Sequence, residues 1–495
     1  MSDYLHGAYG YSNVLDSGES ETGVGAIVYI GTAPVHLVEN GAKSVNKPIL
    51  VRNIAEARKY FGYSDNWADY TLCEAMHVHF ENKAVGPLVL INVLDPAVHK
   101  SGTQGTASLT PANGVITIAN AESIVLDSVV IATTASTPVT KVKGTDYSIA
   151  YDYNTKSIVA TELTAGALGT AALSITYDTV TPASVTSSVV IGSSDGAGSN
   201  TGLYAVRNVY ALTGYIPAFI AAPGFSSVPA IHDVMAEISQ KINDHWDAYM
   251  FVDIPITYNS SAVTLANVAT WKSTNHYNKE NETVFFPLAK GIDGKTYHLS
   301  VLAAANFQEL LLEQDGIPYK TASNTACEII ENLYLGATEV NRVYDEEIIN
   351  EALNKNGIAS AVYTGGRWAI WGAHSADYSF ASGMPISVAE TNRMMLYYVC
   401  NDFQARRSID IDKPISLNDL NTIVSEEQAR IDALVNIGAL IYGAVALNAE
   451  NLNASDIIKG DFSITFNVTT TPLMKSLTAI VNWTERGYQT FYTAE

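Results

Sequence analysis

The sequence predicts a multidomain protein that combines a mixed α/β core, an α+β C-terminal domain and an inserted all-β domain. Its 495 residues are enough for about three domains of ~150 residues each. Strand-like and helix-like periods alternate before residue 100 and again after residue 200, which is typical of an α/β fold. Between these stretches, residues 101–200 contain no Trp, Phe, Cys or Met, which is the composition of a separate domain.

The first hundred residues predict an extended arm followed by part of an α/β domain. Residues 1–24 carry tyrosines among Gly, Ser and acidic residues and show no sustained helical period. Residues 25–100 begin the domain, and Asn53 with Glu56 three positions later marks the start of a capped helix. The continuous apolar run at 87–94 predicts a strand that is buried on both faces.

Residues 101–200 are predicted to form a self-contained β-sandwich or barrel. Short alternating runs, such as 115–119 and 187–191, are separated by turn residues. Inserting such a domain into a surface loop costs little free energy. We interpret the Gly/Ser-rich run at 192–202 as the flexible hinge through which the chain returns.

The α/β pattern resumes in residues 201–355, which complete the α/β domain. A strand at 215–222, an amphipathic helix and a strand at 248–253 predict a βαβ unit, which favours a parallel strand pair. Helical periods also predict helices at 301–314 and 345–356.

Residues 356–486 are predicted to form the α+β C-terminal domain. Strands are expected at 358–363 and 367–372. Helices are expected at 388–403 and 417–436. Two helices packed on a small mixed sheet would bury the apolar faces of both helices.

The end of the chain is predicted to pair with a sheet. A strand at 440–447 is followed by period-two runs at 462–468 and 477–483, and by a β-prone run at 489–493 within a C-terminal arm, residues 487–495. A terminal strand can fold back on its own sheet or cover the edge of another subunit's sheet. We favour the second option. The arm residues are Tyr4, Tyr9, Tyr11, Tyr488, Phe491 and Tyr492, and the strand-accepting sheet contains Phe462, Ile464, Phe466, Leu477, Val481 and Trp483.

The charge of the chain excludes two classes of partner. Lys and Arg number 28 and Asp and Glu number 50, which gives a net charge of −22. Sequence-independent nucleic-acid binding needs a basic face, and an anionic membrane repels an acidic protein. We therefore expect no nucleic acid and no membrane as partner. Charged residues make up only 16% of the chain, against ~25% in typical domains, which favours extensive contact with partner subunits.

The cysteines and the start of the sequence indicate an intracellular protein. Cys73, Cys327 and Cys400 have no metal-binding or redox spacing, and we interpret them as buried, reduced thiols. No basic segment followed by an apolar one marks a signal peptide. The longest apolar run, at 434–447, is too short to span a bilayer.

One short motif offers an enzymatic alternative, an α/β-type hydrolase with an appended β-domain. Residues 192–196 (GSSDG) match G-x-S-x-G, in which Ser194 would follow a strand and directly precede a helix. Linker-like sequence follows instead, so this is the weaker hypothesis. Asp253 ends a strand and is interpreted as a capping residue rather than a catalytic one. His77 and His79 point in different directions on a helix, and we expect neither a metal nor a cofactor.

Several motifs, taken in order, resemble those of contractile-tail sheath proteins. Residues 356–373 (NGIASAVYTGGRWAIWGA) resemble the family's N-x-I/L strand and its G-x-x-x-W-G-A-R-T strand, although residues 374–375 are His and Ser where Arg and Thr are usual. Residues 315–324 (DGIPYKTASN) are similar to the family's DG-x-x-Y-K-SPSN loop. The resemblance covers residues 1–100 and 201–495 in matching order.

The resemblance implies a structural subunit and not an enzyme. Subunits of this family form six-membered rings that stack around an inner tube, and their terminal arms add strands to a neighbour's C-terminal domain. Contraction drives the tube through a cell envelope without consuming a nucleotide. The implied partners are further copies of the chain, the tail tube protein, and baseplate and tail terminator proteins. The implied location is a virion tail or phage-tail-like particle that is assembled in the host cytoplasm, with the inserted domain on its outer surface.

The predicted helix at 417–436, in the domain expected to face the tube, has two interpretations. Its acidic side chains either form an ordinary solvated face or meet a basic patch on the tube, with an attraction that weakens in salt. The sequence leaves both interpretations open. The residues concerned are Asp419, Glu426, Glu427 and Asp432.

Overall fold

The computed structural model describes residues 25–333, 345–381, 384–448 and 460–491. It divides into two compact units, an N-terminal unit that ends at Pro414 and a C-terminal unit that begins at Ile415. The predicted boundary between residues 355 and 356 therefore lies inside the N-terminal unit.

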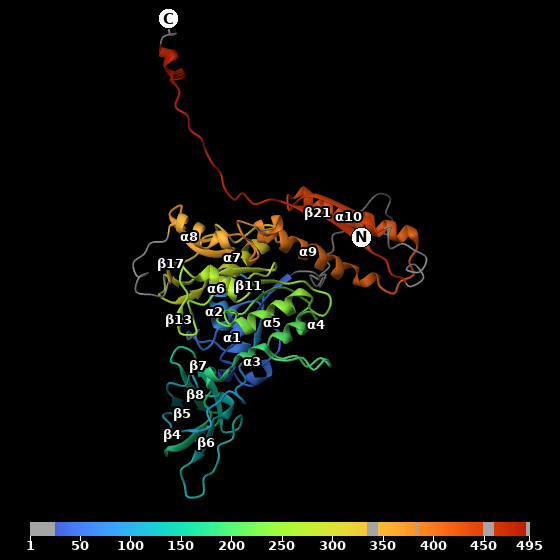
Figure 1. Ribbon diagram of the computed structural model, residues 1–495. Coiled ribbons are helices and arrows are strands. Elements are labelled where there is room, and N and C mark those ends of the chain that lie inside the picture. Colours follow the sequence, from blue (N-terminus) through green and yellow to red (C-terminus); the bar gives the residue numbers. More distant parts are fainter. Residues whose placement is uncertain (1–24, 334–344, 382–383, 449–459, 492–495) are drawn as a thin grey trace, which may run out of the picture. The chain divides into compact units, whose positions relative to one another are not determined.

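The N-terminal unit is built on one eight-stranded sheet with the order β19-β18-β14-β11-β10-β1-β3-β2. Figure 1 labels β11 of this sheet. The six strands from β18 to β3 run parallel to their neighbours, whereas β2 and β19 are antiparallel edge strands. This sheet confirms the predicted α/β core. The strands are β1 Gly25–Gly31, β2 Ile49–Val51, β3 Leu88–Asn92, β10 Ile216–Ala221, β11 Tyr249–Asp253, β14 Glu282–Phe285, β18 Ile358–Thr364 and β19 Arg367–Trp371.

Helices cover both faces of this sheet, because alternate strand residues point into two separate cores. Tyr29 and Phe251 belong to one core, and Val28 and Met250 to the other. The first core also holds side chains of α1 Ile54–Phe61, α2 Leu72–Met76, α7 Leu299–Glu313 and α9 Glu390–Arg407. The second holds side chains of α3 Ser187–Ile191, α4 Val209–Thr213, α5 Pro229–Gln240, α6 Val268–Thr274 and α8 Glu346–Ala352.

The strongest local patterns of the sequence are confirmed. Strands β10 and β11 flank helix α5 and pair in parallel, as the βαβ prediction requires. Every residue of β3 is buried, in agreement with its continuous apolar run. Helix α1 begins as predicted, because the Asn53 side chain accepts a hydrogen bond of 2.9 Å from the backbone N–H of Glu56.

The placement of β18 and β19 differs from the prediction. Both strands form near their predicted positions, but β18 pairs with β14 through Val284 and Ile358, so they extend the main sheet instead of starting the C-terminal domain. A buried apolar run fits any parallel sheet, and nothing local specifies its partner. Several further strands were not predicted from the sequence. They are β14 and the short strands β12 Thr257–Tyr258, β13 Ser261–Ala262, β15 Leu288–Gly291, β16 Thr296–His298 and β17 Ile329–Leu333.

The inserted segment contains two three-stranded antiparallel sheets, ordered β4-β9-β6 and β5-β8-β7. They enclose a core of their own, to which Ile131 and Ile175 contribute from one sheet and Ile116 and Ile158 from the other. Five of the six predicted short strands are present, and β4 is an additional strand that was not predicted. The strands of the insert are β4 Gly105–Leu109, β5 Val115–Ile118, β6 Val130–Thr133, β7 Tyr147–Asp152, β8 Ser157–Glu162 and β9 Leu173–Tyr177.

The C-terminal boundary of the insert lies earlier than predicted. The backbone N–H of Ser101 donates to the carbonyl of Thr179 at 2.8 Å, so the chain enters and leaves the insert at adjacent points. Residues 187–191 form helix α3 instead of the predicted strand, because Val190 packs into the second core of the main sheet. The insert therefore spans about 102–178, and the Gly/Ser run does not lie at its junction.

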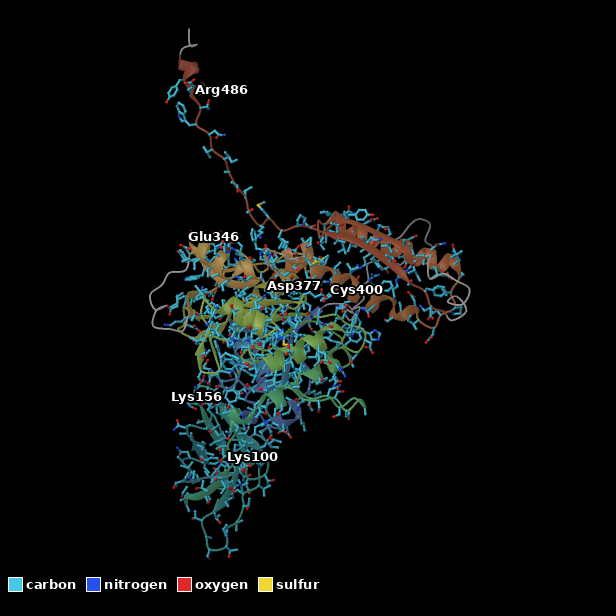
Figure 2. The ribbon with its side chains drawn as sticks, viewed as in Figure 1. Lys100, Lys156, Glu346, Asp377, Cys400 and Arg486 are labelled. Atoms are coloured by element: carbon cyan, nitrogen blue, oxygen red, sulfur yellow. The ribbon has the colours of Figure 1, made fainter. Side chains whose placement is uncertain are left out.

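Polar contacts join the insert to the α/β domain. The Glu122 carboxylate accepts a hydrogen bond from the Ser64 hydroxyl at 2.5 Å and lies 3.5 Å from the Lys156 ammonium, which Figure 2 labels. The Glu122 carbonyl lies 2.9 Å from His36 Nε2. Asp127 accepts from the backbone N–H of Asn40 at 2.6 Å. The insert is thus fixed to the domain by side chains as well as by its two chain connections.

The C-terminal unit consists of helix α10 Leu417–Asn436, an antiparallel pair of strands and a terminal 3-10 helix at Glu485–Phe491. Strand β20 Leu440–Leu447 pairs with β21 Ile464–Thr470. A side chain at Gly443 would place its Cβ 2.0 Å from Ile431 Cγ2, so glycine allows the helix to approach the strand closely. Helix α10 has the bounds that the sequence predicted.

Candidate functional site

The surroundings of Ser194 do not form a nucleophile elbow. Helix α3 precedes this serine where a hydrolase needs a strand, and the chain continues as a loop up to Thr201. The next helical turn begins only at Gly202, so no helix N-terminus faces Ser194.

Asp253 caps a helix start that is distant in sequence, whereas the sequence predicted that it would cap the next turn. Its buried carboxylate accepts hydrogen bonds from the backbone N–H of Ser300 at 3.1 Å and from the Ser300 hydroxyl at 2.5 Å. Ser300 lies in the first turn of α7, where backbone N–H groups lack partners within the helix. Burial raises the pKa of Asp253, which the Ser300 hydrogen bonds oppose. The geometry thus ties the end of β11 to the start of α7.

A second carboxylate, Glu74, ties α2 to the same helix start. Glu74 accepts from the backbone N–H of His298 at 2.6 Å and lies 2.7 Å from His298 Nδ1. Burial alone would lower the pKa of His298, but the Glu74 charge and hydrogen bond outweigh it and raise the pKa to about 9. His298 is therefore a cation at neutral pH, and the pair has a structural role. Among the described residues, no group of three His, Cys, Asp or Glu side chains could hold a metal ion.

Two other histidines are buried in their neutral form. Burial lowers the pKa of His36 to about 4 and that of His79 to about 3. His79 Nε2 lies 2.8 Å from the Tyr29 hydroxyl in the first core, and His36 lies at the joint with the insert. An unfolded chain would take up a proton at each histidine near pH 6.5.

We expect stability to fall as the pH drops from about 6.5 toward 4. Below about pH 6.5, His36 and His79 bind protons in the unfolded chain but stay neutral in the folded chain, because burial lowers the pKa of both. Acid therefore favours unfolding. The loss is on the order of 3 kcal/mol for each histidine. Denaturant titrations between pH 4 and 8 should show a shallower pH dependence for His79→Gln than for the original chain. Equal slopes for the two proteins would contradict the prediction.

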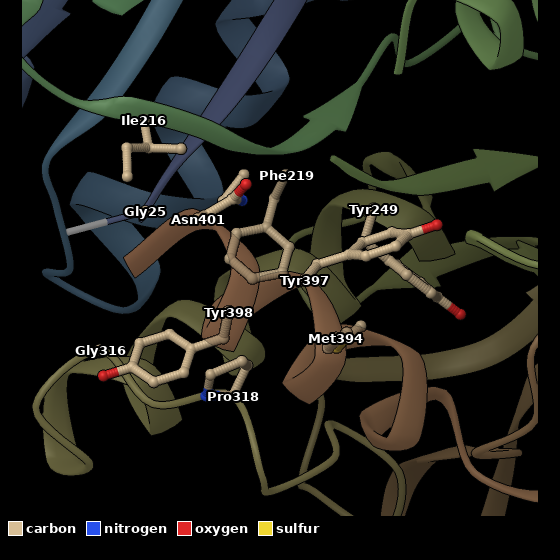
Figure 3. Close-up of a pocket in the computed structure, with 11 residues that line it drawn as sticks. Gly25, Ile216, Phe219, Tyr249, Gly316, Pro318, Met394, Tyr397, Tyr398 and Asn401 are labelled. Carbon is tan, nitrogen blue, oxygen red and sulfur yellow. The ribbon is translucent and has the colours of Figure 1, made fainter. Parts of the chain in front are cut away.

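A small pocket lies between the main sheet and helix α9 in the N-terminal unit (Figure 3). Figure 3 shows the rings of Phe219, Tyr249 and Tyr398 around it. The side-chain amide of Asn401 also lines the pocket. It donates to the Asp247 carbonyl at 2.8 Å and accepts from the Asp247 backbone N–H at 3.0 Å. The lining is apolar and aromatic, and it offers no convergent catalytic groups. Its remaining lining residues are Gly25, Ile216, Ala218, Gly316, Pro318, Met394 and Tyr397.

The predicted arm residues are only partly described. Tyr4, Tyr9, Tyr11 and Tyr492 lie outside the described residues, as does the side chain of Phe491. The β-prone run at 489–493 was predicted to be extended, whereas its described part belongs to the 3-10 helix at the chain's end. Tyr488 in that helix is 57% exposed. Figure 2 labels Arg486 in the same turn.

The second predicted strand of the accepting sheet does not form. Residues 472–484, which we call the extended segment, have no strand partner in the structure. Their large apolar side chains are strongly exposed: Leu477 is 85%, Val481 91% and Trp483 78% exposed. A period-two run becomes a strand only where a neighbouring backbone accepts its hydrogen bonds. These three residues therefore lie in the extended segment and not in the sheet that was predicted to accept another strand.

The other predicted accepting residues lie in or beside the strand pair. Ile464 and Phe466 belong to β21, and Phe462 lies two residues before it. The partner of β21 is β20, whereas the sequence suggested residues 477–483. On one face Gly443 and Val468 lie toward α10, and on the opposite face Asn467 and Thr465 are exposed.

The acidic residues of α10 do not share one face. Asp419 caps the helix start, accepting from Ser416 N and Oγ at 2.8 and 2.7 Å. Glu427 is only 1% exposed, which contradicts its assignment to a surface that could touch a tube. Glu426 is exposed, and Asp432 accepts from Gln428 Nε2 at 2.8 Å. Gln428 was missed because a glutamine among polar helix residues has no recognisable sequence signal.

Cys73 and Cys327 are buried as predicted, but Cys400 on α9 is exposed (Figure 2). No helix in the described ranges combines the length and apolarity needed to cross a bilayer.

Comparison with known proteins reveals similarity over nearly the whole chain. The tail sheath protein of Burkholderia phage BcepMu is 24% identical over 502 aligned residues, which cover 96% of each protein. The major tail sheath protein of Serratia phage KSP20 is 21% identical over 62% of this chain and 74% of its own length. No family model matches the chain.

The fold is also found in solved structures. A chain of the anti-feeding prophage baseplate has a TM-score of 0.54 and 11% identity, with 98% of this chain and 99% of the other covered. The sheath of an extracellular contractile injection system in its contracted state gives a TM-score of 0.52 and 11% identity, over 98% of this chain and all of the other. The predicted mixed α/β and α+β class is thereby confirmed. The chain is thus similar over nearly its whole length to a phage tail sheath protein, and it shares its fold with chains of contractile particles.

Proposed function

We propose that the chain is the structural subunit of a contractile tail sheath. Copies would form six-membered rings that stack around an inner tube, and contraction would drive the tube through a cell envelope. The partners are further copies of the chain and baseplate proteins, together with a tail tube protein and a tail terminator. The particle is a phage tail or a phage-tail-like device, which we expect to assemble in the host cytoplasm.

The observation that carries this proposal is the match to a tail sheath protein across 96% of both chains. The exposed extended segment supports it physically. Leu477, Ile480 and Trp483 are each at least 78% exposed, which is unfavourable in water unless a partner covers them. An extended backbone beside a two-stranded sheet is suited to strand addition between copies. The hydrolase alternative has no support in the relatives or in the surroundings of Ser194.

The test is to purify the chain and to measure its assembly state. Negative-stain images should show tubes or stacked rings, and sedimentation should show very large particles. Omitting or adding nucleotide should leave assembly unchanged. A chain that stays a small oligomer at every concentration and salt condition would contradict a sheath function.

A salt-dependent contact between α10 and the tube remains a prediction. Of the four acidic residues, Glu426 suits it best, because Glu427 is buried and Asp419 is engaged with Ser416. Glu426→Lys should weaken binding of the tube by about tenfold at low salt and by less at high salt. Binding to assembled tube can be followed by co-sedimentation. The control is Glu346→Lys in α8, a charge change of the same size at an exposed helix position outside α10. Equal binding by both variants would favour the ordinary solvated face.

The insert is proposed to lie on the outer surface and to be dispensable for polymerisation. Because Ser101 and Thr179 are hydrogen bonded to each other, a short Gly/Ser linker can replace residues 102–178 without straining the chain. We expect the shortened chain to fold and to form tubes of smaller outer diameter in electron micrographs. The substitution Glu122→Ala in the intact chain is the control for losing the carboxylate contact with Ser64 alone. Folded but unassembled shortened protein would argue against a peripheral role.

A further inference from the structure

Basic side chains gather beside one edge of the eight-stranded sheet. Lys47 lies two residues before the edge strand β2, Lys43 lies in the 3-10 helix Gly41–Ser44, and Lys59 lies on α1, which follows β2. The 3-10 helix and α1 are in contact, so the three lysines share one region of the surface. All three are exposed, and we call them the lysine patch.

The lysine patch is not neutralised by acids of the same chain. Among the described residues, none of its three lysines forms an ion pair. Two acids on the neighbouring segments are engaged elsewhere. Glu56 lies 3.5 Å from Arg52, and Glu39 lies 3.0 Å from Lys143. In a chain with a net charge of −22, an exposed basic patch of this kind attracts the acidic surface of another molecule.

Helix α8 presents acidic side chains near the opposite edge of the same sheet. The indole N–H of Trp371, in the edge strand β19, donates to a side chain of α8 at 2.9 Å. Because Ile349 is buried in the second core, the opposite face of this helix carries Glu347 and Glu351. Both are exposed, and we call them the acidic face of α8. Glu351 lies 2.8 Å from Lys355, whereas Glu347 forms no ion pair in the part of the chain that the structure describes.

The lysine patch and the acidic face of α8 cannot meet within one copy of the chain. Strands β2 and β19 are the first and last of the sheet, and neighbouring strands are about 4.8 Å apart, so the two edges are roughly 34 Å apart. Helices α1 and α8 accordingly lie apart in Figure 1. A contact between the two surfaces therefore joins different copies, head to tail. Contacts of this kind generate closed rings when the rotation between neighbours allows closure.

We infer that the lysine patch of one copy docks on the acidic face of α8 of the next copy, and that this contact links neighbours within a ring. The inference rests on the proposed function and goes beyond it by assigning the two surfaces that meet. Apolar side chains accompany the charges: Ile49 and Leu50 are half-buried in β2, and Ile348 of α8 is 39% exposed. The charges select the neighbour and its register, and their attraction weakens in salt.

Lysine beside an edge strand has a second explanation, because charged side chains also discourage unwanted strand pairing. A glutamate in place of Lys47 keeps a charge next to β2 and therefore protects the edge in the same way. Reversing the charge thus tests the attraction between copies and leaves the protection of the edge intact.

Two full-length variants with reversed charges test the contact. One carries Lys43→Glu and Lys47→Glu, and the other carries Glu347→Lys and Glu351→Lys. Each variant alone places like charges at every contact, so it should need an about tenfold higher concentration to form tubes at low salt. An equimolar mixture should assemble like the original chain, because alternating copies restore opposite charges at every contact of a six-membered ring. The control is Glu237→Lys on the exposed side of α5, which packs on the central strand β11 and should assemble normally.

Circular dichroism checks that each variant is folded, which substitutions at exposed positions should not alter. Variants that assemble alone as readily as the original chain would overturn the inference. A mixture that assembles no better than its two components would overturn it as well. Normal ring assembly combined with weaker tube binding by the variant with two reversed lysines would assign the lysine patch to the tube and not to a second copy.

Sedimentation of the two variants separates this inference from the proposed function. If the original chain forms no tubes under any condition, the sheath function is contradicted, but the contact can still be measured. Association of the two variants with each other, and of neither with itself, would retain the contact between the lysine patch and α8. A mixture that shows no association at low salt would overturn it.

Discussion

Deleting residues 472–495 is expected to give a folded, soluble chain that forms no tubes. Among the described residues the extended segment pairs with no strand, and its large apolar side chains are exposed, so little buried area is lost. The hydrogen bond from Thr471 Oγ1 to the Gly438 carbonyl, at 2.6 Å, is retained in the truncated chain. Stability should therefore change by less than about 0.5 kcal/mol. Assembly should be abolished, because strand addition between copies loses its donor.

Electron microscopy and circular dichroism measure the two halves of this prediction. A deletion of 487–495 alone, which keeps the extended segment, shows whether the last turn is also needed. A full-length variant with Leu477, Ile480 and Val481 changed to serine keeps the backbone and removes the apolar side chains. The prediction fails if the longer truncation assembles normally, and it also fails if that truncation unfolds.

Removing the carboxylate of Glu282 is expected to destabilise the N-terminal unit by ~3–5 kcal/mol. Glu282 begins β14, and its Oε2 lies 2.6 Å from His232 Nε2 of α5, with both side chains fully buried. The backbone N–H of Lys279 donates to its other oxygen at 2.9 Å. Glu282→Ala leaves these donors in the core without an acceptor. Lys272 also loses a nearby charge that opposes the lowering of its pKa, by burial, to about 8.

Equilibrium denaturation of three variants checks this value. Glu282→Gln keeps an acceptor of the same shape and should lose less stability than Glu282→Ala. Asp233→Ala is the exposed control, because Asp233 lies 3.8 Å from His232 Nδ1 and is 54% exposed. It should change stability by no more than about 0.5 kcal/mol. A similar loss from Asp233→Ala and Glu282→Ala would show that burial of the pair is not the cause.

The sequence was most informative where burial and local chemistry agree. The apolar run of β3, the βαβ unit around α5 and the bounds of α10 were all predicted, because each follows from a period and a capping signal. These features depend on neighbours in sequence or on burial alone.

Most of the wrong predictions concern which elements pair or pack with one another in the fold. Residues 358–371 predict two strands, but only the folded structure shows that β14 pairs with the first of them, β18. The alternating run at 187–191 predicts a strand, yet packing against the second core makes it helix α3. The burial of Glu427 was equally invisible, since a glutamate in a polar helix is usually solvated.

The length of the extended segment limits how far two linked copies could separate. The extended segment, residues 472–484, has thirteen residues, and a fully extended chain of that length spans at most about 45 Å. If about five residues are taken up in pairing with a neighbour, the remaining eight form a tether with a reach of ~25 Å. Such slack would let joined copies slide or rotate past one another while their shared strands stay paired. The limit on ring displacement would then be a property of chain length, and inserting residues after Thr471 would lengthen the stroke without touching any folded surface.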